Sequence, residues 1–414
     1  MVLPVFSAAQ IRRAQIAALV IFAANGFLMA TWMSRIPDVK TMLNLSTGEL
    51  GVLLLGISAG AVVGLPLAGK ISSRMGAQGA TRLGMALLLS GLLLAAIAVN
   101  AEISMFLVMP GLALFGFGNG VWDVSQNLEG TEVEQAMGKS IMPWFHAGFS
   151  GGTVVGALVG AAVVWLKVPV LAHLVGALIL AGLVAYWATT GFLPRSADIA
   201  EEEEIAELEA QGGPNQRSAW LEPRTLLVGV MVLAAAFTEG SANDWMAVAF
   251  VEGHDVSKAL GVLGLAVFLT AMTAGRLVGT ALLDRYGRLP VLYAMFAAAI
   301  VGSVLVIFGN TPVAYIGAAI WGVGSSLGFP VGMSAAADDP KRAPMRISVV
   351  ATVGYMAFLA GPPVLGFLGD HVGILHALLA VSAVSALAML VIPVAKPLPG
   401  SQAAIQQAQE RKSQ

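Results

Sequence analysis

Two acids and one asparagine interrupt a long apolar stretch, residues 224–250, in the second half of the chain. Glu239 lies near its middle, Asn243 follows one helical turn later on the same face, and Asp244 lies about 140° around the helix from Glu239. Ionisable groups are costly inside a long apolar helix and commonly mark ion pathways. The spacing predicts that Glu239 takes up and releases a proton and that Asn243 binds a polar ligand. The alternative is a structural Glu239, neutral or ion-paired, that bridges helices.

A second polar stripe lies in the apolar stretch 103–127. It consists of Asn119, Asp123, Gln126 and Asn127. Spacings of three and four residues place these side chains on one face of a helix. Within a membrane such a face must lie against protein or water, so we expect it to line a central cavity. A hydrogen-bonded seam between two helices is the alternative, and the same two interpretations apply to Asn25 in the first stretch.

Aromatic residues and one histidine add candidates. Tryptophans fall in the first, fourth, seventh and tenth apolar stretches, as Trp32, Trp122, Trp245 and Trp321. An indole ring can stack on a sugar-like ring, and Trp122 is a candidate for that role; the alternative is an aromatic belt at the membrane surface. His146 is expected either to join a proton relay, because imidazole titrates near neutral pH, or to hydrogen-bond between helices.

The residue pattern predicts no enzymatic chemistry. The remaining histidines, His173, His254, His371 and His376, have no metal-ligand spacing. No Ser/His/Asp or paired-acid constellation converges at a fixed spacing, and the chain has no cysteine. We therefore expect no catalytic residue, no metal and no cofactor.

Composition identifies the elements that position these residues. Of 414 residues, 57% are hydrophobic and 11% are charged, whereas a soluble domain has about 25% charged residues. A membrane helix needs about 20 apolar residues. The apolar blocks predict twelve membrane helices, at 14–36, 48–70, 81–99, 103–127, 142–164, 170–193, 224–250, 258–283, 289–309, 312–336, 346–368 and 372–395. The net charge of −2 offers no basic excess for a nucleic acid.

The helices fall into two groups of six. The expected organisation is an N-terminal half (1–193), an acidic linker (194–223), a C-terminal half (224–395) and a tail (396–414). With the N-terminus in the cytoplasm, all of the 22 Lys and Arg residues lie near inward-facing ends except Arg35, Lys40, Lys167 and Lys258. Both termini and the linker are therefore expected in the cytoplasm. The first apolar stretch is too long for a signal peptide, so we expect it to be retained.

The two halves are related by an internal repeat. Residues 45–76 align with residues 256–287 at an offset of 211, and the glycine pattern at 116–118 recurs at 322–324 at an offset of 206. Such duplicated halves predict a substrate site at mid-membrane between them. Arg276, just inside the eighth stretch, is expected to pair with an acid such as Asp284 or Glu129.

Two loops carry a resemblance to a known family. The loop after the second helix contains Arg74 and Gly76, and the loop after the eighth contains Asp284, Arg285, Gly287 and Arg288. These residues resemble the signature G-x-x-x-D-R-x-G-R of the major facilitator superfamily, although Ser73 replaces the acid in the first copy and Thr280 the leading glycine in the second. The resemblance implies that the loop charges latch the two halves in one state; simple orientation of the helices by positive charge is the alternative.

A closer resemblance lies in the segments 35–38, 236–245, 348–352 and 361–363, which are similar to the bacterial YbjJ and MosC branch near the fucose permeases. It implies an all-α transporter of the bacterial inner membrane that moves a small polar, sugar- or inositol-like solute by alternating access, as a monomer and in symport with protons. The alternatives are a proton-coupled antiporter that exports amphipathic compounds and a non-transporting membrane receptor. The expected partners are the solute, protons and the lipid bilayer, with no nucleic acid.

Overall fold

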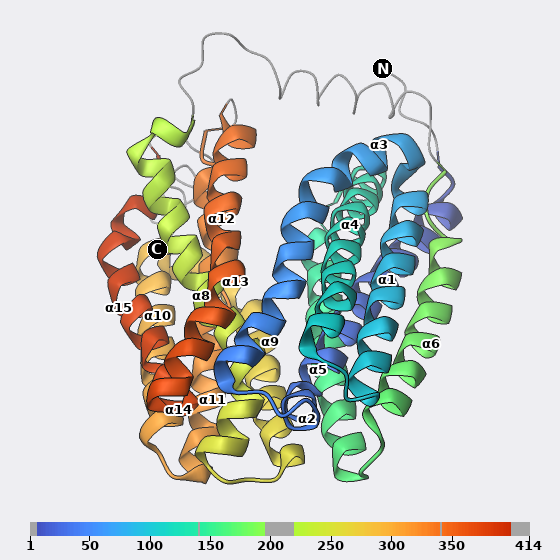
Figure 1. The fold of residues 1–414 in the computed structure, drawn as a ribbon. Coiled ribbons are helices and arrows are strands. Elements are labelled where there is room, and N and C mark those ends of the chain that lie inside the picture. Colours follow the sequence, from blue (N-terminus) through green and yellow to red (C-terminus); the bar gives the residue numbers. More distant parts are fainter. Residues whose placement is uncertain (1–5, 140, 195–218, 340–341, 399–414) are drawn as a thin grey trace. The chain divides into compact units, whose positions relative to one another are not determined.

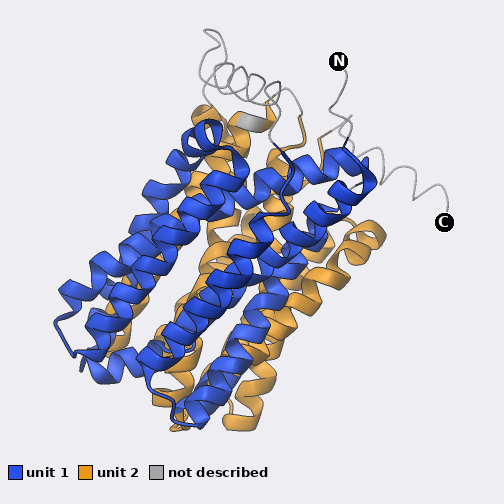
Figure 2. Cartoon of the chain, turned by 90° about the vertical axis from the view of Figure 1, so that its right-hand side faces the viewer, with its two compact units in different colours: residues 1–211, 258–263 blue, residues 212–257, 264–414 orange. Residues whose placement is uncertain are grey.

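The structure, a computed structural model, describes residues 6–139, 141–194, 219–339 and 342–398. In these residues the regular secondary structure is entirely helical. The chain divides into two compact units, residues 1–211 with 258–263 and residues 212–257 with 264–414 (Figure 2). The boundaries expected for the halves, linker and tail stay predictions, and most of the linker and the tail lies outside the described residues.

The helices are named in chain order (Figure 1). The first unit contains α1 (Ala8–Met33), α2 (Ile36–Met42), α3 (Thr47–Asn100), α4 (Met105–Met137), α5 (Met142–Trp165) and α6 (Val170–Thr189). The second contains η1 (Ala219–Leu221), α8 (Pro223–Gly253), α9 (Lys258–Tyr286), α10 (Arg288–Phe308), α11 (Thr311–Ser325), α12 (Gly328–Ala336), α13 (Ala343–Val372), α14 (Ile374–Ala377), α15 (Leu379–Val391) and η2 (Ile392–Ala395). Residues 258–263 of α9 group with the first unit.

The described residues include eleven helices, some of them formed by consecutive elements, that are long and apolar enough to cross a membrane. The longest, α3, has 54 residues. A straight helix of that many residues would measure about 81 Å, against about 30 Å for a bilayer core. At Gly76 its backbone turns to φ 73°, a value that glycine adopts without steric cost. Gly287, with φ 77°, separates α9 from α10 in the same way. Counting α3 as two spans gives the twelve that the sequence predicts.

Large apolar side chains lie exposed along the helices. Leu94 is 55% exposed, Leu183 68% and Leu390 75%. Exposing apolar area to water costs about 25 cal/mol per Å², a cost that is absent in lipid. Together with the long apolar helices, these surfaces identify a multi-pass membrane protein.

The internal repeat is visible as the same close packing in each unit. A Cβ atom added at Gly91 of α3 would lie 2.6 Å from the carbonyl oxygen of Gly111 in α4. One added at Gly302 of α10 would lie 2.6 Å from the carbonyl oxygen of Gly317 in α11. The first pair of residues is related to the second by the offsets of 211 and 206 found in the sequence. Small residues thus bring the two backbones of each helix pair into direct contact.

One interface differs between the units. In the first, Cβ atoms at Gly26 of α1 and Gly152 of α5 would overlap backbone carbonyl groups of the facing helix. The same offsets lead to Phe237 in α8 and Phe358 in α13. In the second unit, a Cβ at Gly240 meets the ring of Phe358 at 3.0 Å rather than backbone. The α1–α5 interface therefore packs backbone on backbone, and the α8–α13 interface includes aromatic side chains.

Substitution of the repeated glycines tests this packing. We expect Gly91→Ala and Gly302→Ala each to lower the free energy of unfolding by about 2 kcal/mol, because the added methyl group meets backbone that cannot move aside. Denaturant unfolding of the purified protein in detergent measures the effect. Gly176→Ala is the control, since nothing lies within 4 Å of a Cβ there. Equal stability of all three variants would contradict the inferred contact.

Candidate functional site

The second unit holds an ion pair within its membrane helices. Arg276 of α9 donates from Nη2 to both carboxylate oxygens of Glu239 of α8, at 3.0 and 3.1 Å. The side chains are 28% and 17% exposed. Arg276 also points Nε at the carbonyl oxygen of Ser326, at 3.4 Å. The expectation that Arg276 pairs with Asp284 or Glu129 is therefore wrong, because the acid that Arg276 binds is Glu239.

This pair changes the interpretation of Glu239. The structural alternative described an ion-paired group that bridges helices, and Glu239 does join α8 to α9 through Arg276. The expected role of Glu239 in taking up a proton stays a prediction. Protonation would remove the charge of the carboxylate and weaken the two charge-assisted bonds, releasing the guanidinium.

Polar groups near Glu239 on α8 are not satisfied. Oδ1 of Asn243 and Nε1 of Trp245 are buried atoms without a hydrogen-bond partner. Asp244 is partly buried, and it forms no hydrogen bond or ion pair with any residue that the structure describes. Buried polar groups normally have partners, because leaving one unpaired costs about 1–3 kcal/mol. These groups are therefore candidates for contact with a ligand.

In the first unit the polar stripe is largely internal to α4. Asp123 Oδ1 accepts a hydrogen bond from Gln126 at 3.0 Å, and Asn127 Nδ2 donates to the carbonyl oxygen of Asp123 at 2.8 Å. These bonds join residues of one helix, so they do not form the interhelical seam of the alternative. Oδ1 of Asn119 and Oε1 of Gln126 are buried without a partner, which leaves these two side chains as the stripe's candidates for ligand contact.

Asn25 of α1 is a buried polar side chain without a hydrogen bond to any residue that the structure describes. It is 1% exposed, and neither Oδ1 nor Nδ2 has a hydrogen-bond partner. The seam expected as its alternative role is absent from the described residues. A side-chain amide with both ends unpaired is costly unless a ligand or water completes it.

We therefore expect Asn25→Leu to raise the free energy of unfolding by about 1 kcal/mol while lowering solute transport. The apolar side chain of similar size removes the unpaired amide, and it removes a ligand contact at the same time. Unfolding in detergent and uptake by whole cells measure the two effects. A variant that loses stability and transport together would indicate a structural Asn25.

The tryptophans divide into two classes. Trp32, Trp122, Trp245 and Trp321 are at most 1% exposed. The aromatic-belt alternative is therefore wrong for these four, because a belt residue faces the membrane surface. The exposed tryptophans, which suit a belt, are Trp144, Trp165, Trp187 and Trp220. Since Trp122 exposes no surface, stacking of a ligand on its ring requires a conformation other than this one.

His146 lies on the surface of α5. Its side chain is exposed, and its ring meets that of Phe22 edge-on with centroids 5.3 Å apart. The contact is between α5 and α1. Its role in a proton relay stays a prediction.

Three of the loop residues expected to form a latch lie on the surface. Arg74, Asp284 and Arg285 are exposed, and Arg285 lies over the ring of Tyr286 at 5.2 Å. None of the three forms an ion pair within the described part of the chain. Their role as a latch stays a prediction.

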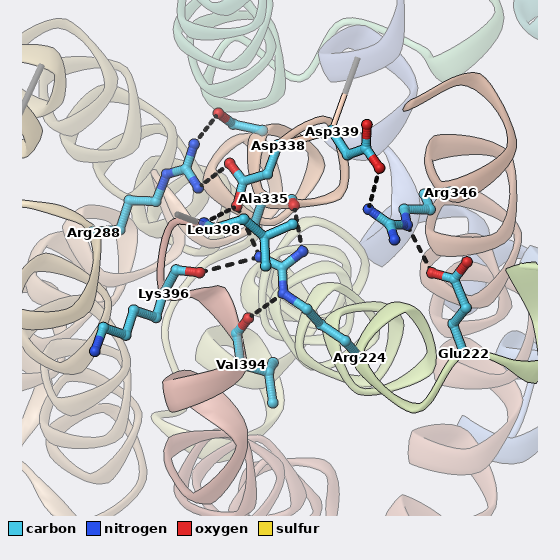
Figure 3. Close-up of polar contacts among 11 residues, drawn as sticks. Glu222, Arg224, Arg288, Ala335, Asp338, Asp339, Arg346, Val394, Lys396 and Leu398 are labelled. Carbon is cyan, nitrogen blue, oxygen red and sulfur yellow. Dashed lines mark hydrogen bonds and ion pairs between the residues drawn. The ribbon is translucent and has the colours of Figure 1, made fainter. Parts of the chain in front are cut away.

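Arg288 is the loop residue with a buried partner. Its Nη1 lies 2.7 Å from Oδ1 of Asp338, whose side chain is only 1% exposed (Figure 3). Arg224 Nη2 binds the other carboxylate oxygen at 2.8 Å, and Arg224 also donates to the carbonyl oxygens of Val394 and Lys396. Asp338 therefore ties the ends of α8, α10 and α12 and the segment after η2 together. Sequence reasoning missed this acid.

Beside this cluster, Glu222 forms an ion pair with Arg346 (Figure 3). It forms a second ion pair with Arg342. Burial alone would raise the pKa of Glu222, but hydrogen bonds from Thr225 and Arg346 and the charges of both arginines hold that pKa below its ordinary value. A lowered pKa in the folded state adds stability at pH values above the unfolded-state pKa, and that contribution is lost as the pH falls through the folded-state pKa.

We expect Glu222→Gln to flatten the acid limb of the stability curve. The wild-type protein loses the contribution of this carboxylate as the medium becomes acidic, whereas the amide has none to lose. Thermal unfolding in detergent at a series of pH values compares the two. A wild-type and a variant curve that stay parallel into the acid range would contradict the assignment.

Comparisons with known proteins agree with this architecture. A family model described as Major Facilitator Superfamily matches residues 139–338 and 246–414. The uncharacterized transporter y4wD of Sinorhizobium fredii is 31% identical over 378 residues, covering 91% of this chain and 96% of that protein. The membrane protein MosC of Rhizobium meliloti is 27% identical over 370 residues, covering 88% of this chain and 85% of that protein.

Solved structures share the fold. The D-xylose-proton symporter aligns with a TM-score of 0.70 at 14% identity, covering 95% of this chain and 99% of that one. A variant of the nucleoside transporter NupG aligns with a TM-score of 0.72 at 13% identity, covering 94% and 100%. Such low identities show the fold alone, whereas the family model and y4wD show descent. The chain therefore belongs to the major facilitator superfamily, in the branch that includes MosC, and it is a membrane transporter rather than an enzyme.

Proposed function

We propose that this transporter carries a small polar, sugar-like solute across the bacterial inner membrane by alternating access, in symport with protons. The observation that supports it most is the Glu239–Arg276 ion pair inside the membrane helices of the second unit. Intramembrane ionisable residues are costly and usually serve ion pathways. We further propose that it acts as a monomer, with both termini in the cytoplasm as the distribution of Lys and Arg predicts.

The proton has a defined role in this proposal. When Glu239 is ionised, Arg276 is held in the pair at 3.0 and 3.1 Å. A proton on Glu239 frees the guanidinium, whose donors then become available to the oxygen atoms of a solute. Loss of the proton on the other side of the membrane would restore the pair and displace the solute. Proton and solute would thus bind together and leave together, which is symport.

The unsatisfied polar atoms favour an uncharged, hydroxyl-rich solute. Asn25, Asn119 and Asn243 offer amide groups, and several indole N–H donors lack a partner. These groups are neutral hydrogen-bonding partners, which suit hydroxyl groups better than the cationic head of an amphipathic compound. The names of two structural neighbours, a D-xylose-proton symporter and a nucleoside transporter, point in the same direction.

A ligand screen followed by a flux measurement tests the proposal. Purified protein is heated with sugars, inositols, sugar acids, nucleosides and common efflux substrates, because a ligand of the native state raises its apparent stability. A sugar-like hit that also drives proton entry into proteoliposomes would support symport. Hits confined to amphipathic cations would favour the export alternative. Transport of a hit without proton movement would contradict the proposed proton symport.

A further inference from the structure

A groove of about 350 Å³ lies on the first unit, between the start of α1 and the end of α6. Its lining includes Arg12, Arg13, Ile16 and Val20 on one side and Trp187 on the other. The walls are mostly apolar, and none of the residues that line it is acidic. Two positively charged side chains, Arg12 and Arg13, therefore lie at one end of an apolar groove on the surface of a membrane protein.

The arginines are available to a ligand. Arg13 donates from Nη2 to Oγ1 of Thr190 at 3.1 Å, which uses one of its five N–H donors. Neither Arg12 nor Arg13 forms an ion pair with any residue in the described ranges, and both side chains are exposed. Gly191 lets the stem of Arg13 lie close to the end of α6, since a Cβ there would lie 3.2 Å from Cγ of Arg13. The geometry holds the positive charge at the mouth of the groove.

The apolar part of the groove lies on the exposed surface of the helices. Ile16 is 50% exposed and Trp187 69% exposed. Arg12, Ile16 and Val20 are spaced by four residues, so they form one stripe on α1 that rises about 12 Å from charge to hydrocarbon. Exposed tryptophan marks the level of the lipid headgroups. A free phosphate ion would use only the arginines, whereas a molecule with an anionic head and an apolar chain would contact the whole stripe.

We propose that this groove binds an anionic phospholipid, with its phosphate on Arg12 and Arg13 and an acyl chain along Ile16 and Val20. Charge complementarity selects the headgroup, and the length of the apolar stripe selects a lipid over a soluble anion. The site depends only on the membrane location of the protein. It is independent of the solute and of proton coupling, so it stands or falls separately from the proposed transport mechanism.

Lipid titration of the purified full-length protein tests the site. Native mass spectrometry counts bound phosphatidylglycerol, and thermal unfolding in detergent records the stabilisation that it produces. For the R12Q/R13Q variant we expect the apparent dissociation constant of phosphatidylglycerol to rise about thirtyfold. The K70Q/K139Q variant is the matched control, because it removes the same charge from exposed lysines of this unit outside the groove, and it should bind like the wild type.

Further arms distinguish the lipid from other occupants. Val20→Trp narrows the apolar part of the groove and should weaken phosphatidylglycerol binding while both arginines remain. Equal stabilisation by phosphatidylcholine or by inorganic phosphate would overturn the proposal, as would a wild-type response from R12Q/R13Q. The acidic run at residues 201–204 is another candidate occupant of the groove. Lipid binding that appears only after these four glutamates are changed to glutamine would assign the groove to that run instead and overturn the lipid site.

Discussion

The Glu239→Gln variant is expected to lose concentrative uptake, with its accumulation ratio falling to about one under an imposed proton gradient. Glutamine keeps the size and a hydrogen-bonding oxygen for Arg276, but it cannot carry a proton through the cycle. Exchange of labelled for unlabelled solute should persist, because exchange needs binding and conformational change without net proton movement. Uptake and exchange in proteoliposomes, with the solute found by the screen, measure the two activities.

Two further variants make this result specific. Glu252→Gln removes the same charge from an exposed position at the end of α8 and should leave uptake unchanged. Arg276→Gln leaves the Glu239 carboxylate without its cation, so it should lower both stability and uptake. Proton-driven accumulation that survives in Glu239→Gln would show that the Glu239–Arg276 pair is structural only. Loss of exchange as well would place Glu239 in solute binding rather than in coupling.

The Asp338→Asn variant is expected to lose about 3 kcal/mol of folding free energy. Its carboxylate is 1% exposed and binds both Arg224 and Arg288, so the amide would leave two guanidinium groups close together without a neutralising charge. Denaturant unfolding in detergent measures the loss. Asp339→Asn is the matched control, because Asp339 is 35% exposed and lies 3.7 Å from Arg346. The loss of folding free energy in Asp339→Asn should stay below about 1 kcal/mol. Equal losses in the two variants would contradict the expectation that the buried Asp338 stabilises the fold more than Asp339 does.

Much of the fold could be predicted because a membrane imposes simple rules on a sequence. Apolar stretches of sufficient length gave the twelve spans, including the division of α3 at Gly76, where the glycine stands at the same place as Gly287 in the repeat. The offsets between the halves also relate the close helix contact at Gly91 to the one at Gly302, although only the structure shows that these contacts exist. These features depend on local composition and periodicity, which the chain displays directly.

The site was less predictable because its contacts join residues distant in sequence. Glu239 could be chosen for its depth in an apolar stretch, but its partner Arg276 depends on how α8 packs against α9. Asp338 looked like an ordinary loop acid, and only the folded chain brings Arg224 and Arg288 to it. The buried state of Trp122 likewise follows from packing, which no spacing rule contains.

The different interfaces at Gly26 and Phe237 give the two units unequal stiffness. At Gly26 and Gly152, backbone packs directly on backbone, and no side chain there can change rotamer. We therefore expect α1 and α5 to move together as one rigid body. The ring of Phe358 beside Gly240 can turn about its torsions, so α8 can tilt or shift against α13 without breaking a continuous contact. The helix that carries Glu239 therefore packs against α13 in part through side chains that can change rotamer. In the proposed mechanism, the more deformable of these two interfaces thus involves the helix whose carboxylate takes up and releases the proton.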